Sequence, residues 1–325
     1  MIDIIMPVYN AEKFIEKTLE YLEKQTFKKF RVILVNDGSN DLTKSLIENY
    51  ILTSKMNIKL INQKNMGEGE ARNTGLKFSD KKYILFLDCD DYLAENALEK
   101  YFFSIEKNKS QLIVSGYFYV NTKGTLLKSY ILNNQVIKNK HIIIEKVLKK
   151  EIPLGIGNTL IKSEIIKNKL YFSKYKYAAD SNFFNKMILD IDEITIISDP
   201  LFYYVKNENS VMHTKFSLQR LEGLEAINDT YEYYVKMGYG EYSEFFKYLY
   251  NFELMSVYIS FLKGKNKNYV EEVNKILKTE KKIKLKSFFK NGSRNKYMFL
   301  LFYFSKNIFK KIYILYLFLR RLSNR

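Results

Sequence analysis

The stretch KYILFLDCDDYL, residues 82–93, places three carboxylates directly after a run of apolar residues. Tyr83–Leu87 has the length and composition of a buried strand, and Asp88, Asp90 and Asp91 follow it around a single cysteine. Residues two apart in a strand or tight turn project to the same side, so Asp88 and Asp90 can face one cation. Such hard oxygen ligands suit Mg²⁺ or Mn²⁺. The alternative is a solvated turn in which Asp91 caps the next helix.

Three other apolar runs precede this strand, and helical patterns separate them. The runs are DIIMPVYN (residues 3–10), FRVILVND (30–37) and IKLIN (58–62), with helices expected near residues 11–24, 42–47 and 69–78. Short apolar strands that alternate with helices indicate a mostly parallel sheet covered on both faces. The expected fold class is therefore α/β.

Polar side chains also follow the first two of these strands. Asn10 ends the first run, and Asn36–Ser39 ends the second. In a parallel sheet the carboxyl ends of the strands meet at one edge, and ligands bind beyond that edge. Because these clusters should converge with Asp88 and Asp90, we expect a functional site there.

Two loops of this region have the chemistry of nucleotide recognition. Asp37 can accept a hydrogen bond from a nucleobase N–H, and Gly38 permits a tight turn beside it, although both could simply form a capping turn. The loop NMGEGEARNTG, residues 65–75, offers glycine backbone for close approach to a ligand and Arg72 for pairing with an anion. It lacks the Gly-Lys-Ser/Thr sequence of a P-loop, and the first strand is not followed by a glycine-rich dinucleotide motif.

The pattern loosens after residue 120. Gly124 is expected in a hairpin turn, and apolar residues recur at helical spacing through residues 217–278. We expect a large domain followed by helices and a tail, with these boundaries: 1–215 (halves 1–120 and 121–215), 216–280 and 281–325.

The net charge of +17 is concentrated at one end of the chain. Residues 281–325 hold 13 Lys and Arg and no Asp or Glu, which leaves 40 basic against 36 acidic residues elsewhere. Binding of nucleic acid over the whole surface of residues 1–280 is therefore disfavoured.

The single cysteine cannot form an internal disulfide, and the first ten residues lack the pattern of a signal peptide. Both features favour a cytoplasmic location.

The tail itself has an amphipathic pattern between residues 297 and 322. Its longest apolar runs are eight residues, far short of the roughly 20 needed to span a bilayer. Lysines and arginines fall on one half of a helical wheel, which favours peripheral contact with the inner face of the plasma membrane. Docking of the tail on the preceding domain and a partner helix in a homo-oligomer stay open. A basic nucleic-acid-binding or membrane-tethering protein that acts through this tail is the alternative function.

Four motifs together resemble glycosyltransferase family 2. They are PVYNAEKFIEKTLEYLEKQT (residues 7–26), VNDGSND (35–41), NMGEGEARNTG (65–75) and LFLDCDD (85–91), in the order and spacing of that family. The resemblance is dense over about residues 1–120 and weaker to about residue 215. It implies a GT-A fold, which is a Rossmann-like sheet flanked by helices. It also implies inverting transfer from a nucleotide-sugar, taken as a UDP-sugar, to a glycan or lipid-linked acceptor in surface polysaccharide synthesis.

The resemblance also implies roles for individual residues. Asp88 and Asp90 match the Asp-x-Asp that holds Mn²⁺ or Mg²⁺ and the diphosphate, and His213 in YYVKNENSVMHTKF could reach the same metal. A lone histidine is more often structural, so that second interpretation of His213 stays open. The implied nucleotide-sugar-binding residues are Pro7, Val8, Tyr9, Asn10, Asp37, Asn65, Gly67, Arg72 and Asp88.

Inverting transfer also requires a general base that takes the proton of the acceptor hydroxyl. The family supplies it from a Glu-Asp pair that opens a helix, and KYAADSNFFNKMI (residues 176–188) resembles that segment with Ala179 in place of the glutamate. Asp180 is then the expected base. It could also serve as the N-cap of a helix over 182–187, and the two roles are compatible.

Overall fold

The computed structural model describes residues 1–167, 172, 175, 177–206, 218–264 and 270–279, together with residues 302, 305, 306, 309, 310 and 313. The chain divides into two compact units, Met1–Ser210 and Val211–Arg325. His213, assigned above to the metal, lies outside the described residues.

The first unit is built on one mixed sheet. Its first four strands in spatial order pair in parallel, and they form the apolar half that the sequence predicts. The order is β3 (Asn57–Gln63), β2 (Phe30–Asp37), β1 (Ile2–Val8), β4 (Tyr83–Phe86), β9 (Thr159–Lys162), β6 (Leu112–Asn121), β10 (Ile194–Lys206) and β5 (Tyr92–Leu93). Strand β9 runs antiparallel to both β4 and β6, and therefore joins the two parallel parts. Strands β7 (Leu126–Tyr130) and β8 (Gln135–Ile137) add to β6 and β10.

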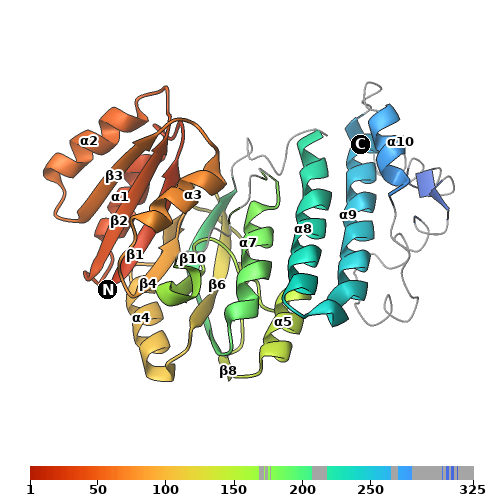
Figure 1. Ribbon diagram of the computed structural model, residues 1–325. Helices are drawn as coiled ribbons and strands as arrows, with labels where there is room; N and C mark the ends of the chain where they lie inside the picture. The colour runs from red at the N-terminus through yellow and green to blue at the C-terminus, as the bar shows by residue number, and fades with distance from the viewer. Residues whose placement is uncertain are drawn as a thin grey trace. The chain divides into compact units, whose positions relative to one another are not determined.

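Helices cover both faces of the parallel half (Figure 1). They are α1 (Ile15–Glu23), α2 (Thr43–Thr53), α3 (Glu68–Lys77) and α4 (Ala97–Asn108); α5 (Lys140–Leu148), α6 (Ser163–Ile166) and α7 (Ala179–Met187) follow, with a 3-10 turn at Ile188–Asp190. Helix α1 begins four residues later than the predicted residue 11, because Asn10 adopts a φ of 49° and the chain first turns, with the Phe14 amide bonded to the Ala11 carbonyl.

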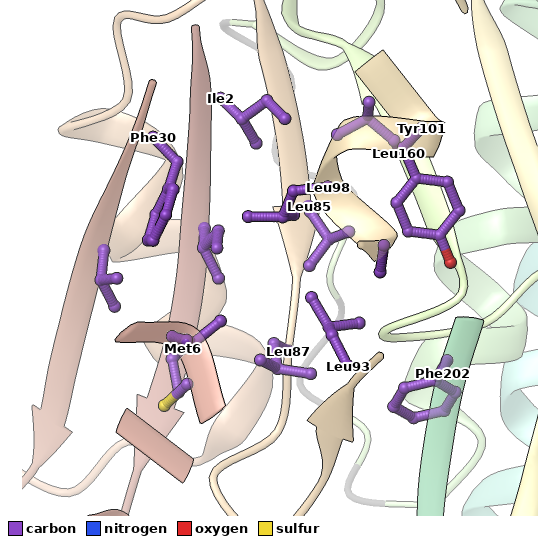
Figure 2. Close-up of a cluster of buried hydrophobic side chains, with 14 of the residues drawn as sticks. Ile2, Met6, Phe30, Leu85, Leu87, Leu93, Leu98, Tyr101, Leu160 and Phe202 are labelled. Atoms are coloured by element: carbon purple, nitrogen blue, oxygen red, sulfur yellow. The ribbon is translucent and has the colours of Figure 1, made fainter. Parts of the chain in front are cut away.

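Strand β1 shows why the chain folds into layers around the sheet. Ile4 and Met6 point into a cluster that packs on α1 and α4, and Figure 2 shows Met6 near Leu87, with Leu85 and Leu98 in the same cluster. Ile5 points to the opposite face, because alternate residues of a strand face opposite ways. There it meets Gly75 of α3, where an added Cβ would lie 2.3 Å from the Ile5 side chain. The glycine therefore lets α3 pack close against the sheet, with its N-terminus at the edge where β2 and β4 end.

The second unit is helical over its described residues. It contains α8 (Glu222–Lys236), α9 (Ser243–Gly264) and α10 (Val270–Leu277), with 3-10 turns at Leu218–Leu221 and Gly240–Tyr242. Phe302, Phe309 and Tyr313 of the predicted tail are buried with Leu254 and Tyr258 of α9. Most of the predicted amphipathic face lies outside the described residues. Within the part of the chain that the structure describes, no helix combines the length and hydrophobicity needed to cross a membrane.

The fold class expected from the sequence is confirmed. An α/β sheet with flanking helices is followed by a helical C-terminal region. The structure shows a more mixed sheet than the sequence pattern predicts, because β9 enters antiparallel between β4 and β6. The predicted turn at Gly124 is present, with a φ of 81°, between β6 and β7.

Candidate active site

The three aspartates that follow β4 lie in a tight turn. The Asp91 amide donates to the Asp88 carbonyl over 3.2 Å, which closes the turn. Burial and the Asp88 carboxylate raise the pKa of Asp90 to about 6, so these two acids lie close enough to repel each other. That Asp88 and Asp90 share one cation stays a prediction.

Asp91 does not cap the next helix. Helix α4 starts at Ala97 after Asn96, whereas the buried Asp91 carboxylate accepts a hydrogen bond from the Val205 amide over 2.8 Å. Asp91 therefore ties the turn to β10, a strand more than 100 positions away in the sequence. Burial and the carboxylates of Asp88 and Asp90 raise its pKa well above the usual range.

Arg72 is the centre of an ion cluster and is completely buried. Its two terminal nitrogens donate to Asp88 Oδ1 over 2.7 Å and to Asp180 Oδ1 over 2.8 Å. The same guanidinium also pairs with Glu68, one helical turn before it. Within the described part of the chain its Nε has no hydrogen-bond partner. One guanidinium therefore joins the expected diphosphate-side carboxylate and the expected general base, which stand 92 positions apart in the sequence.

Aromatic packing holds α7 in place opposite β4. The Phe183 ring packs edge-on against Phe86 of β4, with ring centroids 5.5 Å apart, and stacks on Phe172 at 4.1 Å. Phe172 also lies 5.2 Å from the Arg72 guanidinium. These contacts fix the first turn of α7, and Asp180 is its second residue. The helix begins at Ala179, so Asp180 lies inside the first turn rather than at the N-cap.

Asp180 is half-exposed and is paired with Arg72. Its side chain is 48% exposed, so an acceptor can approach it, while Arg72 fixes one of its oxygens. Desolvation raises the pKa of Asp180, although Arg72 opposes that shift. A carboxylate whose pKa is raised binds a proton more readily at neutral pH than an ordinary aspartate does.

Asp37 organises the loop between β3 and α3. Its Oδ1 accepts from the Met66 amide and from Gln63 Nε2, and its Oδ2 accepts from the Gly67 amide, each over 2.8 Å. Gly38 has a φ of 72°, and a Cβ there would lie 2.8 Å from the Asn65 amide nitrogen. Asp37 and Gly38 thus hold Asn65 and Gly67 beside the end of β2, where the sequence places nucleotide-sugar contacts.

The loops after β1 and β2 are joined to each other by side chains. The Asn10 amide donates to Ser39 Oγ over 3.0 Å, and Asn10 Oδ1 accepts from the Asn40 amide over 3.0 Å. The Ala11 amide donates to Thr43 Oγ1 over 2.7 Å. We call this set the β1–β2 loop pair.

The remaining expected nucleotide contacts lie at the end of β1. Pro7 and Val8 are buried within the strand, and Tyr9, the next residue, is 49% exposed. Tyr9 and Asn10 therefore present themselves at the same sheet edge as Asp37. The side chains of Pro7 and Val8 are buried, so these two residues can offer mainly backbone groups at that edge.

The carboxylates of this edge fit a divalent cation. The Asp88 and Asp90 carboxylates repel each other. Glu68, Asp88 and Asp180 all form ion pairs with the Arg72 guanidinium. Within the described residues no three His, Cys, Asp or Glu side chains are arranged as a complete metal cage. Mg²⁺ is usually bound by one or two carboxylates, with water and phosphate oxygens in its remaining coordination positions. Asp88 and Asp90 would hold the ion.

Sequence reasoning missed two polar side chains of this site. Glu68 pairs with Arg72, and Gln63 orients Asp37. The i,i+4 spacing of Glu68 and Arg72 within one helix was a usable signal for the first contact. The second depends on the parallel pairing of β2 with β3, which places Gln63 opposite Asp37.

Comparisons with known proteins identify the family and the fold. The family model of glycosyl transferase family 2 matches residues 3–168. Glycosyltransferase GlyG of Streptococcus pneumoniae is 24% identical over 229 residues, which are 67% of this chain and 75% of GlyG. TarS of Staphylococcus aureus, a poly(ribitol-phosphate) β-N-acetylglucosaminyltransferase, is 28% identical over 238 residues, which are 69% of this chain and 40% of TarS. The matched part of the chain thus covers less than half the length of TarS.

Solved structures share the fold. TarS residues 1–349 in complex with UDP-GlcNAc superpose with a TM-score of 0.73 at 20% identity, covering 97% of this chain and 91% of that one. The mannosyltransferase PcManGT of Pyrobaculum calidifontis, in complex with GDP-Man and Mn²⁺, gives 0.52 at 15% identity, covering 86% and 78%. The family model covers just over half of the chain. The chain therefore belongs to glycosyl transferase family 2 and is a glycosyltransferase.

Proposed function

We propose that this chain transfers a sugar from a UDP-sugar to a hydroxyl of a surface glycan or lipid-linked acceptor, with inversion and with a divalent cation. The TarS structure that shares its fold binds UDP-GlcNAc. GgaB of Bacillus subtilis, 29% identical over 217 residues, is named a minor teichoic acid biosynthesis protein. These relatives favour a cell-surface polymer as the acceptor.

The observation that carries the proposal is the position of Arg72 between Asp88 and Asp180. Inverting transfer needs a base on one side of the anomeric carbon and the leaving diphosphate on the other. The buried Arg72 guanidinium forms hydrogen bonds to both carboxylates concerned. Asp180 is the proposed base, and Asp88 is the carboxylate proposed on the diphosphate side. Arg72 thereby fixes the separation of the two groups, and fixed orientation is a large part of the rate advantage of an enzyme.

The proposed reaction uses the chain's own residues as follows. Asp180 accepts the proton of the acceptor hydroxyl as that oxygen attacks the anomeric carbon from the face opposite the diphosphate. Arg72 keeps Asp180 oriented and leaves one carboxylate oxygen free of its own contact. A divalent cation bound by Asp88 and Asp90 would neutralise charge on the departing diphosphate.

The nucleoside would bind where β1 and β2 end. Tyr9 offers an exposed aromatic ring there, and Asp37 offers carboxylate oxygens. An ionised carboxylate has about four lone-pair positions, and three are used in holding the loop, so one is left for a nucleobase N–H. Asn65 and Gly67 would contact the nucleoside from the loop that Asp37 positions.

The experiment is transfer from UDP-GlcNAc to poly(ribitol phosphate) with Mn²⁺, measured as UDP release above that seen without the acceptor, together with thermal shift by the same nucleotide-sugar. Asp180→Asn should retain the thermal shift and lose at least a hundredfold in transfer, since the general base contributes about that much. The matched control is Asp80→Asn, an aspartate that is 59% exposed and pairs with Arg31 instead. If no nucleotide-sugar stabilises the protein with either Mn²⁺ or Mg²⁺, the proposed function is wrong.

A further inference from the structure

Four half-buried tyrosines from three strands share one face of the sheet. Tyr117 and Tyr119 come from β6, Tyr130 from β7 and Tyr204 from β10. The strand register places Tyr117 opposite Tyr130 and Tyr119 opposite Tyr204. Because alternate residues of a strand face the same way, all four side chains stand on one side. We call them the tyrosine patch.

The rings of the patch pack side by side. Tyr117 stacks on Tyr130 with centroids 4.5 Å apart, and Tyr119 stacks on Tyr204 at 4.9 Å. Phe202 lies between the two pairs, 6.5 Å from both Tyr117 and Tyr204, and is buried in the core of the first unit. Figure 2 shows Phe202 at the edge of that core. The patch is therefore anchored, and its rings lose little freedom when a ligand binds.

The chemistry of the patch is polar as well as aromatic. Lys128 Nζ donates to the Tyr130 hydroxyl over 2.9 Å. Burial and the neighbouring Tyr130 raise the pKa of Tyr117 to about 12, so its hydroxyl stays neutral near pH 7. A neutral phenol both donates and accepts hydrogen bonds. Rings with such hydroxyls, beside an ammonium group, suit a ligand that has hydroxyls and apolar C–H faces.

The patch adjoins the carboxylates of the candidate active site. The Val205 amide, next to Tyr204, donates to Asp91 Oδ1 over 2.8 Å. Burial, Tyr130 and the Asp91 carboxylate all raise the pKa of Tyr119, which places that ring within electrostatic reach of the aspartate turn. A ligand on the patch would therefore lie beside the turn that carries Asp88, Asp90 and Asp91.

We propose that the tyrosine patch binds the hydroxyl-rich chain of the acceptor and directs its reactive hydroxyl toward the carboxylates. The proposal rests on the proposed function and adds the residues that recognise the acceptor. An apolar protein partner is disfavoured, because the patch carries four phenolic hydroxyls and Lys128. A carbohydrate or polyol chain matches both its rings and its hydrogen-bonding groups.

The chain supplies a matched control on the same strand. Tyr203 is also half-buried, but it faces the opposite side of the sheet, where it stacks on Tyr92 at 4.6 Å. Tyr203→Ala and Tyr204→Ala remove the same atoms from adjacent positions of β10. Tyr204→Phe removes only the hydroxyl and keeps the ring packed, so it reports on hydrogen bonding in a protein with an intact core.

The experiment is binding of the full chain to an array of bacterial surface glycans and poly(ribitol phosphate), with UDP at saturation. Apparent affinity for the glycans bound by the wild type should fall roughly tenfold in Tyr204→Ala and roughly fivefold in Tyr204→Phe, since a neutral hydrogen bond contributes about 1 kcal/mol. Tyr203→Ala should bind as the wild type does. UDP-GlcNAc binding, followed by thermal shift, should be the same in all four proteins.

Two results would overturn the proposal. One is equal loss of glycan binding in Tyr203→Ala and Tyr204→Ala, or no loss in either. The other is a wild-type chain that binds nothing on the array. Failure of the proposed function is a separate outcome, because it appears as absent UDP-GlcNAc binding and UDP release, and array binding requires no turnover.

Discussion

Arg72→Met tests whether one buried guanidinium holds the candidate active site together. Breaking a buried ion pair by removing one partner costs about 3–5 kcal/mol. Here the carboxylates left behind are partly wetted, because the side chains of Asp88 and Asp180 are 27% and 48% exposed. Water can therefore solvate them, and we expect a loss of about 2–3 kcal/mol in the free energy of unfolding. At about 2–4 °C per kcal/mol for a domain of this size, Tm should fall by about 4–12 °C.

A double-mutant cycle separates the ion pair from lost packing. Asp180→Asn alone should change the free energy of unfolding by less than about 1 kcal/mol, since half of its side chain is exposed. In the double variant, the asparagine removes a charge that loss of the guanidinium would leave unpaired. The combined loss should therefore be smaller than the sum of the single losses by about 1–2 kcal/mol.

The assay is urea unfolding in EDTA, followed by circular dichroism because the chain has no tryptophan. The control cycle pairs Asp180→Asn with Arg31→Met, since Arg31 bonds to Asp3 and Asp80 and not to Asp180. That cycle should be additive within about 0.5 kcal/mol. Additivity in the Arg72 cycle as well would refute the idea that Arg72 and Asp180 act as a unit.

Three other changes test separate features. Asp90→Asn should abolish the extra thermal shift that Mn²⁺ adds to UDP, and an unchanged Mn²⁺ effect would remove Asp90 from the metal site. Gly38→Ala should cost about 2–4 kcal/mol by urea unfolding, through its positive φ and a Cβ 2.8 Å from backbone. Gly238→Ala, with a φ of 86° and nothing within 4 Å, should cost only about 1–2 kcal/mol, and equal losses would refute the contact argument. Lys310→Glu should reduce flotation with anionic liposomes about tenfold if the tail binds membrane. This exposed charge is a cleaner probe than truncation, which would remove Phe302 from the core of the second unit; unchanged flotation would reject membrane binding.

The parallel half of the sheet could be predicted because its signals are local. Each strand is a short apolar run that ends in polar residues, and the predicted run Phe30–Asp37 coincides with β2. The polar strand ends then follow from a general property of parallel sheets. The same reasoning brought Asp37, Asp88 and Asp90 to one edge without knowledge of any contact.

The contacts that complete the site could not be predicted in this way. Asp180 meets Arg72 across 108 positions, and Asp91 meets the Val205 amide across 114. Both depend on how the later strands and α7 return to the sheet, and hydrophobic periodicity contains no information on that return. The alternative in which Asp91 caps the next helix is wrong for this reason, because a cap is a local role and the contact of Asp91 is a distant one.

The β1–β2 loop pair has a consequence for the thermodynamics of ligand binding. A loop that becomes ordered around a ligand loses about 1–2 kcal/mol of backbone conformational entropy per residue. Here the backbone at Asn10 and Ala11 is already fixed by Ser39 of the neighbouring loop and by Thr43, the first residue of α2. That ordering takes place during folding, so a nucleoside bound there would meet a preformed surface. Binding of the nucleotide at this end should then resemble binding to a rigid template. It should carry a small entropic penalty, and its association should be fast.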